Sequence, residues 1–363
     1  MKRKPVIALT ADHRELPNGE IQSCSHVWEQ TFSEAGCDVR YVDPFASDFI
    51  ESISQYDAFL WWVPSNTHYR EYYKRVVFYM EAYSGVYVFP DMCTIWHYRD
   101  KIAQYYLFDI NKIDCAKTHV FFSKEKTYHF LENTNYPFVF KLPYSAFSND
   151  VVMISSKEEG YKLANLMFDQ GIYSVPSSFD PPNLFDRSRR RVKNTLKAAI
   201  IDPIPAPRET RLLQKNFFYA QEFLPGNEND TRVTIIGNRA FAFRRFNREN
   251  DFRASGSGKV DWDPEGIDLE VVRKAFEIND TIKAQAIAMD FLYKEGRPVL
   301  IEVNFSFITW VVRDCPGHWI RDNNKNGEVR WEQGMEEPAR AIAEDILTQL
   351  DTSTTREAYP ELP

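Results

Sequence analysis

The chain has 363 residues, more than one compact core usually holds and enough for two or three domains. Hydrophobic residues make up 44% and charged residues 26%, the balance of an ordinary globular protein, which excludes a fibrous or largely disordered chain. The net charge is −8, which argues against a general nucleic-acid binder. No apolar run reaches the roughly 18 residues of a membrane span.

The cysteines bear on the compartment and on metal binding. They are Cys24, Cys37, Cys93, Cys115 and Cys315. No C-x-x-C pair is present, so a structural zinc site is not expected. An odd number without regular spacing is typical of a reducing compartment. The apolar stretch at residues 6–11 is too short for a signal peptide, and we therefore expect a cytoplasmic protein.

The first block, residues 1–100, alternates short apolar runs with helical patterns. Strands are predicted at residues 6–10, 38–42, 58–63 and 85–89, and helices at residues 26–35 and 70–84. Strands separated by helices of this length form βαβ units and a parallel sheet. We therefore expect a Rossmann-like domain, without the G-x-G-x-x-G loop of an evident dinucleotide site.

The second block, residues 101–215, is predicted to be a small α+β domain. Helices are expected at residues 100–108, 124–131 and 157–168, and strands at residues 119–122, 137–142 and 151–154, with a loop at residues 143–150. A proline-rich stretch follows, and it carries a basic run. The run consists of Arg187, Arg189, Arg190, Arg191 and Lys193. It is either a solvated helix face or an anion-binding wall.

The third block, residues 216–350, has an antiparallel pattern. A strand at residues 217–224 precedes a hairpin of residues 232–236 and 240–246, whose turn is Gly237-Asn238. A second hairpin joins residues 289–293 to 298–305. Helices are predicted at residues 268–288 and 336–350, and residues 351–363 form a tail.

Acidic and amide side chains of the second hairpin form a candidate metal site. Glu302 and Asn304 are two apart on a strand, so their side chains leave the same face. The short turn places Asp290 within about one residue of the position opposite Glu302. Carboxylates this close need a cation, and oxygen donors of this kind suit Mg²⁺ with nucleotide phosphates. The alternative is a solvated sheet face.

Arginines gather in and just after the first hairpin. They are Arg232, Arg244, Arg245 and Arg253. Guanidinium groups bind phosphate oxygens bidentately, so these residues are candidates for phosphate contacts. Arginines on the exposed face of a sheet are the alternative.

Two lysines and one strand end add to the candidate anion site. Lys141 ends an apolar strand, where a charge is costly without a partner such as a phosphate, unless the side chain reaches solvent. Lys101 is a second candidate for the same anion site. Residues 221–226 form a strand end with a Pro-Gly corner, whose backbone groups can hydrogen-bond an adenine edge. Glu228 and Asp230 follow and can bind ribose hydroxyls; a simple turn is the alternative.

In their order and spacing these features resemble the ATP-grasp superfamily, nearest to the branch of glutathione synthetase and the ribosomal-protein glutamate ligase. The best-matched runs are Gln221-Glu-Phe-Leu-Pro-Gly, Asp230-Thr-Arg, Asp251-Phe-Arg, Ala288-Met-Asp and Leu300-Ile-Glu-Val-Asn. The resemblance covers roughly residues 101–350. It implies a multi-domain α/β and α+β chain, with an ATP-grasp fold preceded by the Rossmann-like domain and divided into subdomains at 101–215 and 216–350.

The resemblance implies roles for the candidate residues. The implied ATP-binding residues are Lys101, Lys141, Gln221, Glu222, Phe223, Leu224, Glu228, Asp230 and Arg244. The implied catalytic residues, which would bind the γ-phosphate and the acyl-phosphate or acceptor carboxylate, are Arg232, Arg245 and Arg253. The implied ligands of two Mg²⁺ ions are Asp290, Glu302 and Asn304.

The activity implied is ATP- and Mg²⁺-dependent ligation of a carboxylate to an amine through an acyl-phosphate, with release of ADP and phosphate. The implied partners are small-molecule carboxylates and amines, such as a uronic acid and an amino acid, and family members are often homo-oligomers. A ligase that modifies a peptide, and a non-catalytic nucleotide-binding scaffold, are the alternatives.

Three stretches depart from the pattern of the family. The phosphate lid at residues 143–150 has no glycine, and Ser255 stands where the family often has Asn. After Asn304, residues 305–310 and 315–319 are rich in aromatic residues. We expect these two stretches to line a bulky acceptor pocket.

Overall fold

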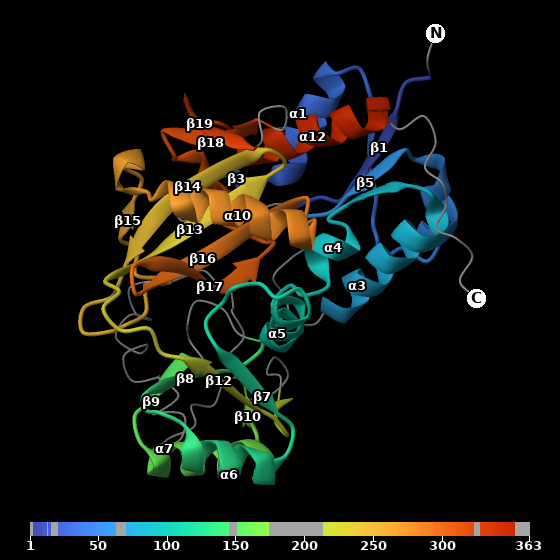
Figure 1. Cartoon of the computed structure of the whole chain (residues 1–363). Helices are drawn as coiled ribbons and strands as arrows, with labels where there is room; N and C mark the ends of the chain where they lie inside the picture. Colours follow the sequence, from blue (N-terminus) through green and yellow to red (C-terminus); the bar gives the residue numbers. More distant parts are fainter. Residues whose placement is uncertain are drawn as a thin grey trace.

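The computed structural model describes residues 3–12, 14–15, 21–62, 70–144, 151–173, 213–322 and 327–352. The predicted basic run, most of the predicted phosphate lid and the tail after residue 352 lie outside these ranges. The described elements form a parallel sheet, a large antiparallel sheet and a small antiparallel sheet, with the small sheet at the bottom of Figure 1. No helix in the described ranges combines the length and hydropathy needed to cross a membrane.

The parallel sheet confirms the strands expected in the first block. It runs in the order β4 (Asp38–Tyr41), β1 (Val6–Leu9), β5 (Ala58–Leu60) and β6 (Tyr87–Phe89). Its connections include β2 (Arg14–Glu15), β3 (Ile21–Gln22), α1 (Cys24–Glu34), α2 (Phe49–Ser52), η1 (Ile53–Gln55), α3 (Arg70–Tyr79), η3 (Met80–Ser84) and α4 (Met92–Ile95). Ser23 caps the start of α1, and its side chain accepts a hydrogen bond from the His26 N–H.

The small sheet is antiparallel. Its order is β7 (Thr118–Phe121), β12 (Phe218–Glu222), β8 (Phe138–Lys141) and β9 (Val151–Ile154). Its helices are α6 (Lys124–Asn133) and α7 (Lys157–Asp169), and the short strands β10 (Ile172–Tyr173) and β11 (Leu213–Gln214) pair beside it. The strand β12 opens the third predicted block, yet it pairs with β7 and β8, so the chain leaves the small sheet only after Glu222.

The large sheet contains both predicted hairpins. Its order is β17 (Arg297–Asn304), β16 (Ala286–Lys294), β13 (Asn229–Ile236), β14 (Arg239–Phe246), β18 (Gly317–Asp322) and β19 (Glu328–Gln333), with β15 (Val260–Asp261) also paired to β14. The expected turn at Gly237-Asn238 is confirmed, and Gly237 has a φ of 56°. The turn between β16 and β17 is Glu295-Gly296, where both residues have positive φ.

Helices cover the two faces of the large sheet. The helix α10 (Leu269–Ile282) packs on one face, where Val233, Ala242 and Met289 are buried (Figure 1). The helix α12 (Pro338–Thr352) packs on part of the other face with Ile236 and Phe241, and α11 (Thr309–Arg313) and η5 (Pro264–Gly266) are short. The helix α5 (Lys101–Ile110) lies between the large and small sheets (Figure 1).

Two elements of the third block differ from the prediction. The helix predicted at residues 268–288 ends at Ile282, because Lys283 takes the left-handed conformation, with a φ of 59°. Residues from Ala286 onward are therefore free to form β16. The hairpin of β18 and β19 was not predicted. It includes residues 317–319, and Trp319 is buried against the α10 side of the sheet.

The parallel sheet and the large sheet share one hydrophobic core. Trp28, Phe59 and Phe89 of the first block belong to the same buried cluster as Phe305 and Ile342. The side chain of Gln285 adds a polar link at the same boundary. Its amide donates to the Val88 carbonyl at 2.9 Å and to the Tyr87 hydroxyl at 3.0 Å, and its oxygen accepts from the Asp91 N–H at 2.9 Å.

We expect Gln285→Leu to lower the free energy of unfolding by about 2–4 kcal/mol, because leucine leaves the Val88 carbonyl and the Asp91 N–H without their partner. Urea denaturation measures the change. Gln55→Leu is the control: the Gln55 amide is exposed and donates to the nearby Ser52 carbonyl, so its effect should stay below about 0.5 kcal/mol. Equal midpoints for the two variants would contradict the role given to Gln285.

Candidate active site

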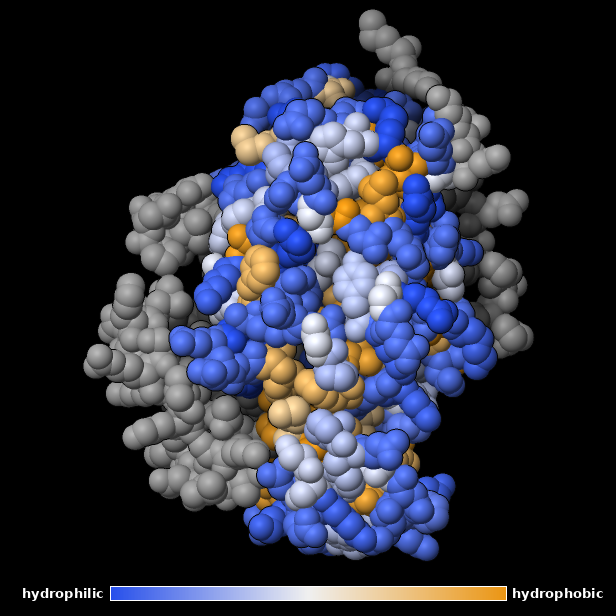
Figure 2. Space-filling view, turned by 60° about the vertical axis from the view of Figure 1, so that its left-hand side comes forward, coloured by the Kyte–Doolittle hydropathy of each residue, from blue (hydrophilic) through white to orange (hydrophobic). Residues whose placement is uncertain are grey.

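A cavity of about 1090 Å³ lies where the large sheet, the small sheet and the first block meet. All of the predicted site residues line it except Glu228 and Arg244. The face in Figure 2 is mostly hydrophilic, with a band of apolar residues above the bottom of the molecule. The cavity gathers predicted residues that lie far apart in the sequence, from Lys101 to Asn304.

The two exceptions follow from strand geometry. Side chains alternate along β14, so Phe243 and Arg245 face the cavity while Arg244 leaves the opposite face and pairs with Asp261. Glu228 is exposed outside the cavity, and its carbonyl accepts a hydrogen bond from the Asn247 N–H. The structure does not bring Arg244 or Glu228 to the nucleotide-binding position predicted for them.

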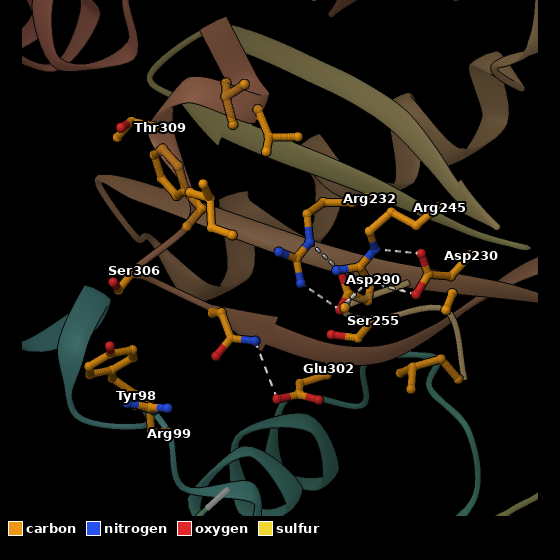
Figure 3. Close-up of a pocket in the computed structure, with 18 of the residues that line it drawn as sticks. Tyr98, Arg99, Asp230, Arg232, Arg245, Ser255, Asp290, Glu302, Ser306 and Thr309 are labelled. Atoms are coloured by element: carbon orange, nitrogen blue, oxygen red, sulfur yellow. Dashed lines mark hydrogen bonds and ion pairs between the residues drawn. The ribbon is translucent and has the colours of Figure 1, made fainter. Parts of the chain in front are cut away.

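The centre of the cavity holds an arginine–aspartate cluster, composed of Arg232, Arg245, Asp230 and Asp290. Arg232 binds both Asp290 oxygens, at 2.6 and 2.8 Å. Arg245 binds both Asp230 oxygens, at 2.7 and 2.6 Å, and also lies 2.9 Å from Asp290 Oδ2 (Figure 3). Asp290 thus orients two guanidinium groups toward the same space.

Strand register produces this cluster. Arg232 lies directly opposite Asp290 across β13 and β16, and Asp230 lies opposite Arg245 across β13 and β14. All four side chains leave the face that α10 does not cover. Burial alone would raise the pKa of Asp290, but Arg232 and Arg245 hold it well below its usual range. Asp290 is therefore ionised throughout the physiological range.

Two buried lysines face the same cavity. Lys101 is the first residue of α5 and lies 3.3 Å from Glu302 Oε1; the Asp100 side chain caps this helix. Lys141 ends β8 in the small sheet. Only 4% of Lys101 and 6% of Lys141 are exposed. Burial, opposed by Glu302 and aided by the charge of Lys101, lowers the pKa of Lys141 to about 8. An anion placed between the two ammonium groups would relieve their repulsion.

The predicted metal ligands lie side by side. Glu302 is opposite Asp290 in the register, as expected, and the Asn304 amide is 3.2 Å from Glu302 Oε1. Across the described ranges no three His, Cys, Asp or Glu side chains form a metal cluster. The donor set here is two carboxylates and an amide, which fits Mg²⁺ when nucleotide phosphates and water supply the other oxygens.

The strand end expected to contact adenine borders an apolar slot. Phe223 and Phe252 meet edge to face with their ring centroids 5.7 Å apart, and Leu224 and Leu292 line the same region. The Gln221 side chain instead donates to the Ile301 carbonyl at 3.4 Å. Both oxygens of Asp230, a predicted ribose ligand, are bound by Arg245, so in this structure Asp230 serves to hold the guanidinium.

Arg253 connects the large sheet to the small one. It pairs with Asp251 and donates to the Val151 carbonyl of β9 at 3.3 Å. The loop that carries it includes Ser255, which faces the Asp290 side of the cavity in Figure 3. The predicted acceptor residue is therefore placed at the cavity, already oriented by a neighbouring acid.

The part of the cavity away from the arginine–aspartate cluster was only partly predicted from the sequence. Phe307 and Trp310 line it as expected, whereas residues 315–319 do not, because they form β18 and its approach. Asp12 and Arg99 also line this part and were not predicted. Asp12 follows β1, and the carboxyl ends of parallel strands commonly carry ligand-binding residues, which was the available signal. Arg99 lies beside Tyr98 and Ser306, away from the arginine–aspartate cluster (Figure 3).

Comparisons with known proteins identify the fold. No family model and no curated protein matches the sequence. Among solved structures, the chain is similar to a RimK domain protein ATP-grasp from Sphaerobacter thermophilus, with a TM-score of 0.51, 14% identity and coverage of 94% of this chain and 99% of that one. The macrocyclase MdnC bound with precursor peptide MdnA, from Microcystis aeruginosa, gives a TM-score of 0.52 at 13% identity, covering 94% and 99%. The D-cycloserine synthetase DcsG gives 0.52 at 13%, covering 95% and 99%. The expected ATP-grasp fold is confirmed.

We expect the affinity for ADP, measured by calorimetry in metal-free buffer, to fall above pH 8. The charged form of Lys141 attracts phosphate, and with a pKa of about 8 this charge is present below pH 8 and lost above it. The dissociation constant should therefore rise by up to about tenfold per pH unit until binding no longer depends on the charge. Lys141→Met should bind weakly with no such slope. A wild-type affinity independent of pH between 7 and 9.5 would contradict this.

We expect Asp290→Asn to lower the free energy of unfolding of the nucleotide-free protein by about 3–5 kcal/mol, since it leaves two buried guanidinium groups short of a counter-charge. Chemical denaturation measures the loss. Asp280→Asn removes one partner of the more exposed pair with Arg321 and should cost less than about 1 kcal/mol. Similar losses in the two variants would show that the cluster is not held by Asp290.

Proposed function

We propose that this chain, built on the ATP-grasp fold, is an ATP- and Mg²⁺-dependent ligase that joins a carboxylate to an amine. One observation carries the proposal: the cavity brings two buried lysines, two oriented arginines and three oxygen donors to a common space. Burying this many charges is costly unless a charged ligand uses them. A triphosphate with its divalent cation matches both signs of charge.

Each group has a place in this proposal. The apolar slot beside Phe223 and Leu224 would hold adenine, with the phosphates extending toward Lys101 and Lys141. Arg232 and Arg245 would bind the γ-phosphate through N–H groups that Asp290 orients. Asp290, Glu302 and Asn304 would hold Mg²⁺, which when bound neutralises charge on the phosphate oxygens.

The chemistry then needs positioning more than a protein nucleophile. A substrate carboxylate oxygen attacks the γ-phosphorus and ADP leaves, which yields an acyl-phosphate. A neutral amine attacks the acyl carbon, phosphate leaves, and the nitrogen loses one proton to give the amide. The arginines would stabilise the transferred phosphoryl group, and the enclosing walls would keep water from the acyl-phosphate. A non-catalytic nucleotide-binding scaffold has no chemical need for metal ligands beside oriented arginines, so we favour the ligase.

The substrates fall into two classes. Small carboxylates, including uronic acids, match the expectation from the sequence. A peptide is the second class, and the similarity to a macrocyclase bound with a precursor peptide supports testing it. We place the reacting carboxylate between Arg253 and the arginine–aspartate cluster, and the rest of the substrate toward Phe307 and Trp310.

The proposal is tested in two steps. Thermal unfolding is followed with a non-hydrolysable ATP analogue, with and without Mg²⁺; stabilisation that needs both supports the site, because a ligand of the folded state alone raises the melting temperature. ADP release is then measured over pools of carboxylates and peptides, with hydroxylamine as a general amine. Failure of every nucleotide to stabilise the protein would refute the proposal.

We expect Glu302→Gln to lower ADP release by about 100-fold or more, because it removes a charged oxygen donor from the predicted metal site. The rate is measured at saturating Mg²⁺ with whichever pool is active. Glu332→Gln, at an exposed position on β19, is the matched control and should leave the rate unchanged. Full activity of Glu302→Gln would remove Glu302 from the proposed metal site.

A further inference from the structure

The edge of the large sheet passes through the predicted metal site. The strand β17 carries Glu302 and Asn304, and it is the outermost strand, paired only with β16 among the named strands. An edge strand has N–H and C=O groups that point away from its sheet and need other partners. Val303 lies between Glu302 and Asn304 and is 0% exposed, so water does not supply partners for its N–H and C=O groups.

The side chain of Gln104 meets this need. Its amide N–H donates to the Val303 carbonyl at 2.8 Å, and its oxygen accepts from the Val303 N–H at 3.3 Å. The oxygen and one N–H of this primary amide bond as a peptide group of a neighbouring strand would, and its nitrogen also donates to the His97 carbonyl at 3.4 Å. Gln104 is itself 3% exposed and comes from α5, about 200 residues earlier in the chain.

The same helix also holds Glu302. Lys101 precedes Gln104 by three residues, so both side chains lie on one face of α5. Lys101 contacts the Glu302 carboxylate and Gln104 contacts the next residue along β17. Gln221 from β12 adds a contact to the Ile301 carbonyl. Contacts from α5 and β12 therefore converge on the segment of β17 that carries the predicted metal donors.

We propose that Gln104 is a positioning residue for the divalent cation. By closing the edge of β17 at Val303, it holds Glu302 and Asn304 in the orientation in which both face the cavity. Without this contact only the pairing with β16 would hold this end of the strand, and the two donors would be less firmly fixed in their common direction. This inference rests on the proposed function, since it assumes that the cation accompanies the nucleotide at Glu302 and Asn304.

Binding measurements separate positioning from general stability. The affinity for AMPPNP is measured by calorimetry in EDTA and in saturating Mg²⁺, and the affinity for Mn²⁺ is measured by electron paramagnetic resonance with AMPPNP present. We expect Gln104→Leu to weaken Mn²⁺ binding by about tenfold and to reduce the gain that metal gives to AMPPNP, while affinity in EDTA stays near that of the wild type. Gln104→Met, which keeps the side-chain length, should behave alike and serves if the leucine variant does not fold.

Gln285→Leu is the matched control. Gln285 is also an amide that bonds to backbone groups, but those groups, the Val88 carbonyl and the Asp91 N–H, belong to the first block and not to β17. It should lower stability without changing the ratio between affinities with and without metal. Hydrogen exchange gives a second readout: the Val303 N–H should be protected in the metal-free wild type and exchange faster in Gln104→Leu.

Three outcomes would overturn the inference. Unchanged Mn²⁺ affinity in both Gln104 variants would show that Gln104 does not position the donors. A loss of AMPPNP affinity that is equal in EDTA and Mg²⁺, and is shared by Gln285→Leu, would show a general effect on folding. If wild-type protein bound AMPPNP equally well with and without metal, the metal site of the proposed function would fail, and this inference with it.

Discussion

The pairing of β13 with β14 on one side and β16 on the other is the constraint on which the site depends. This register puts Arg232 opposite Asp290 and Asp230 opposite Arg245, and alternation sends all of them to one face. Toward the other end of the same strands, that face carries Ile236 and Ala286, which pack in the core beneath α12. One sheet face therefore continues from a hydrophobic core into a charged cavity, so the rigid core fixes the direction of the guanidinium groups.

The electrostatics of the cavity follow from this continuity. Asp290 stays ionised because two guanidinium groups offset the cost of its burial. On the other side, Lys101 and Lys141 share Glu302 as their nearby acid, and the pKa of Lys141 falls as a result of burial beside Lys101. The site is thus internally paired around Asp290 and short of negative charge around the lysines. A ligand with several phosphate oxygens would complete the second half, whereas a cation held by Asp290 would share its oxygens with Arg232 and Arg245.

The first block, the large sheet and the small sheet meet at this cavity, and the contacts between them are of different kinds. The first block and the large sheet share a hydrophobic core and the Gln285 link. The small sheet meets the large one through polar contacts, such as Arg253 to the Val151 carbonyl and Gln221 to the Ile301 carbonyl, and through a small apolar cluster of Ala116, Leu224 and Val299. Apolar cores resist separation more than a few hydrogen bonds do. Relative movement, which a closing active site uses, is therefore expected between the small sheet and the rest.

Local patterns in the sequence determined the β13–β14 and β16–β17 hairpins, the parallel strands and several charged residues that line the cavity, because period-two alternation and turn residues act over a few positions. They placed Asp290 within about one residue of the position opposite Glu302, and a register shift between Asp290 and Phe291 brings the two directly opposite each other. Only the tertiary structure decided that Arg244 faces away, that β12 joins the small sheet, and that residues 317–319 belong to a strand. It also decided that Gln104 closes the edge of β17. These outcomes depend on contacts between segments 15 to 200 residues apart, whose free energies no local pattern encodes.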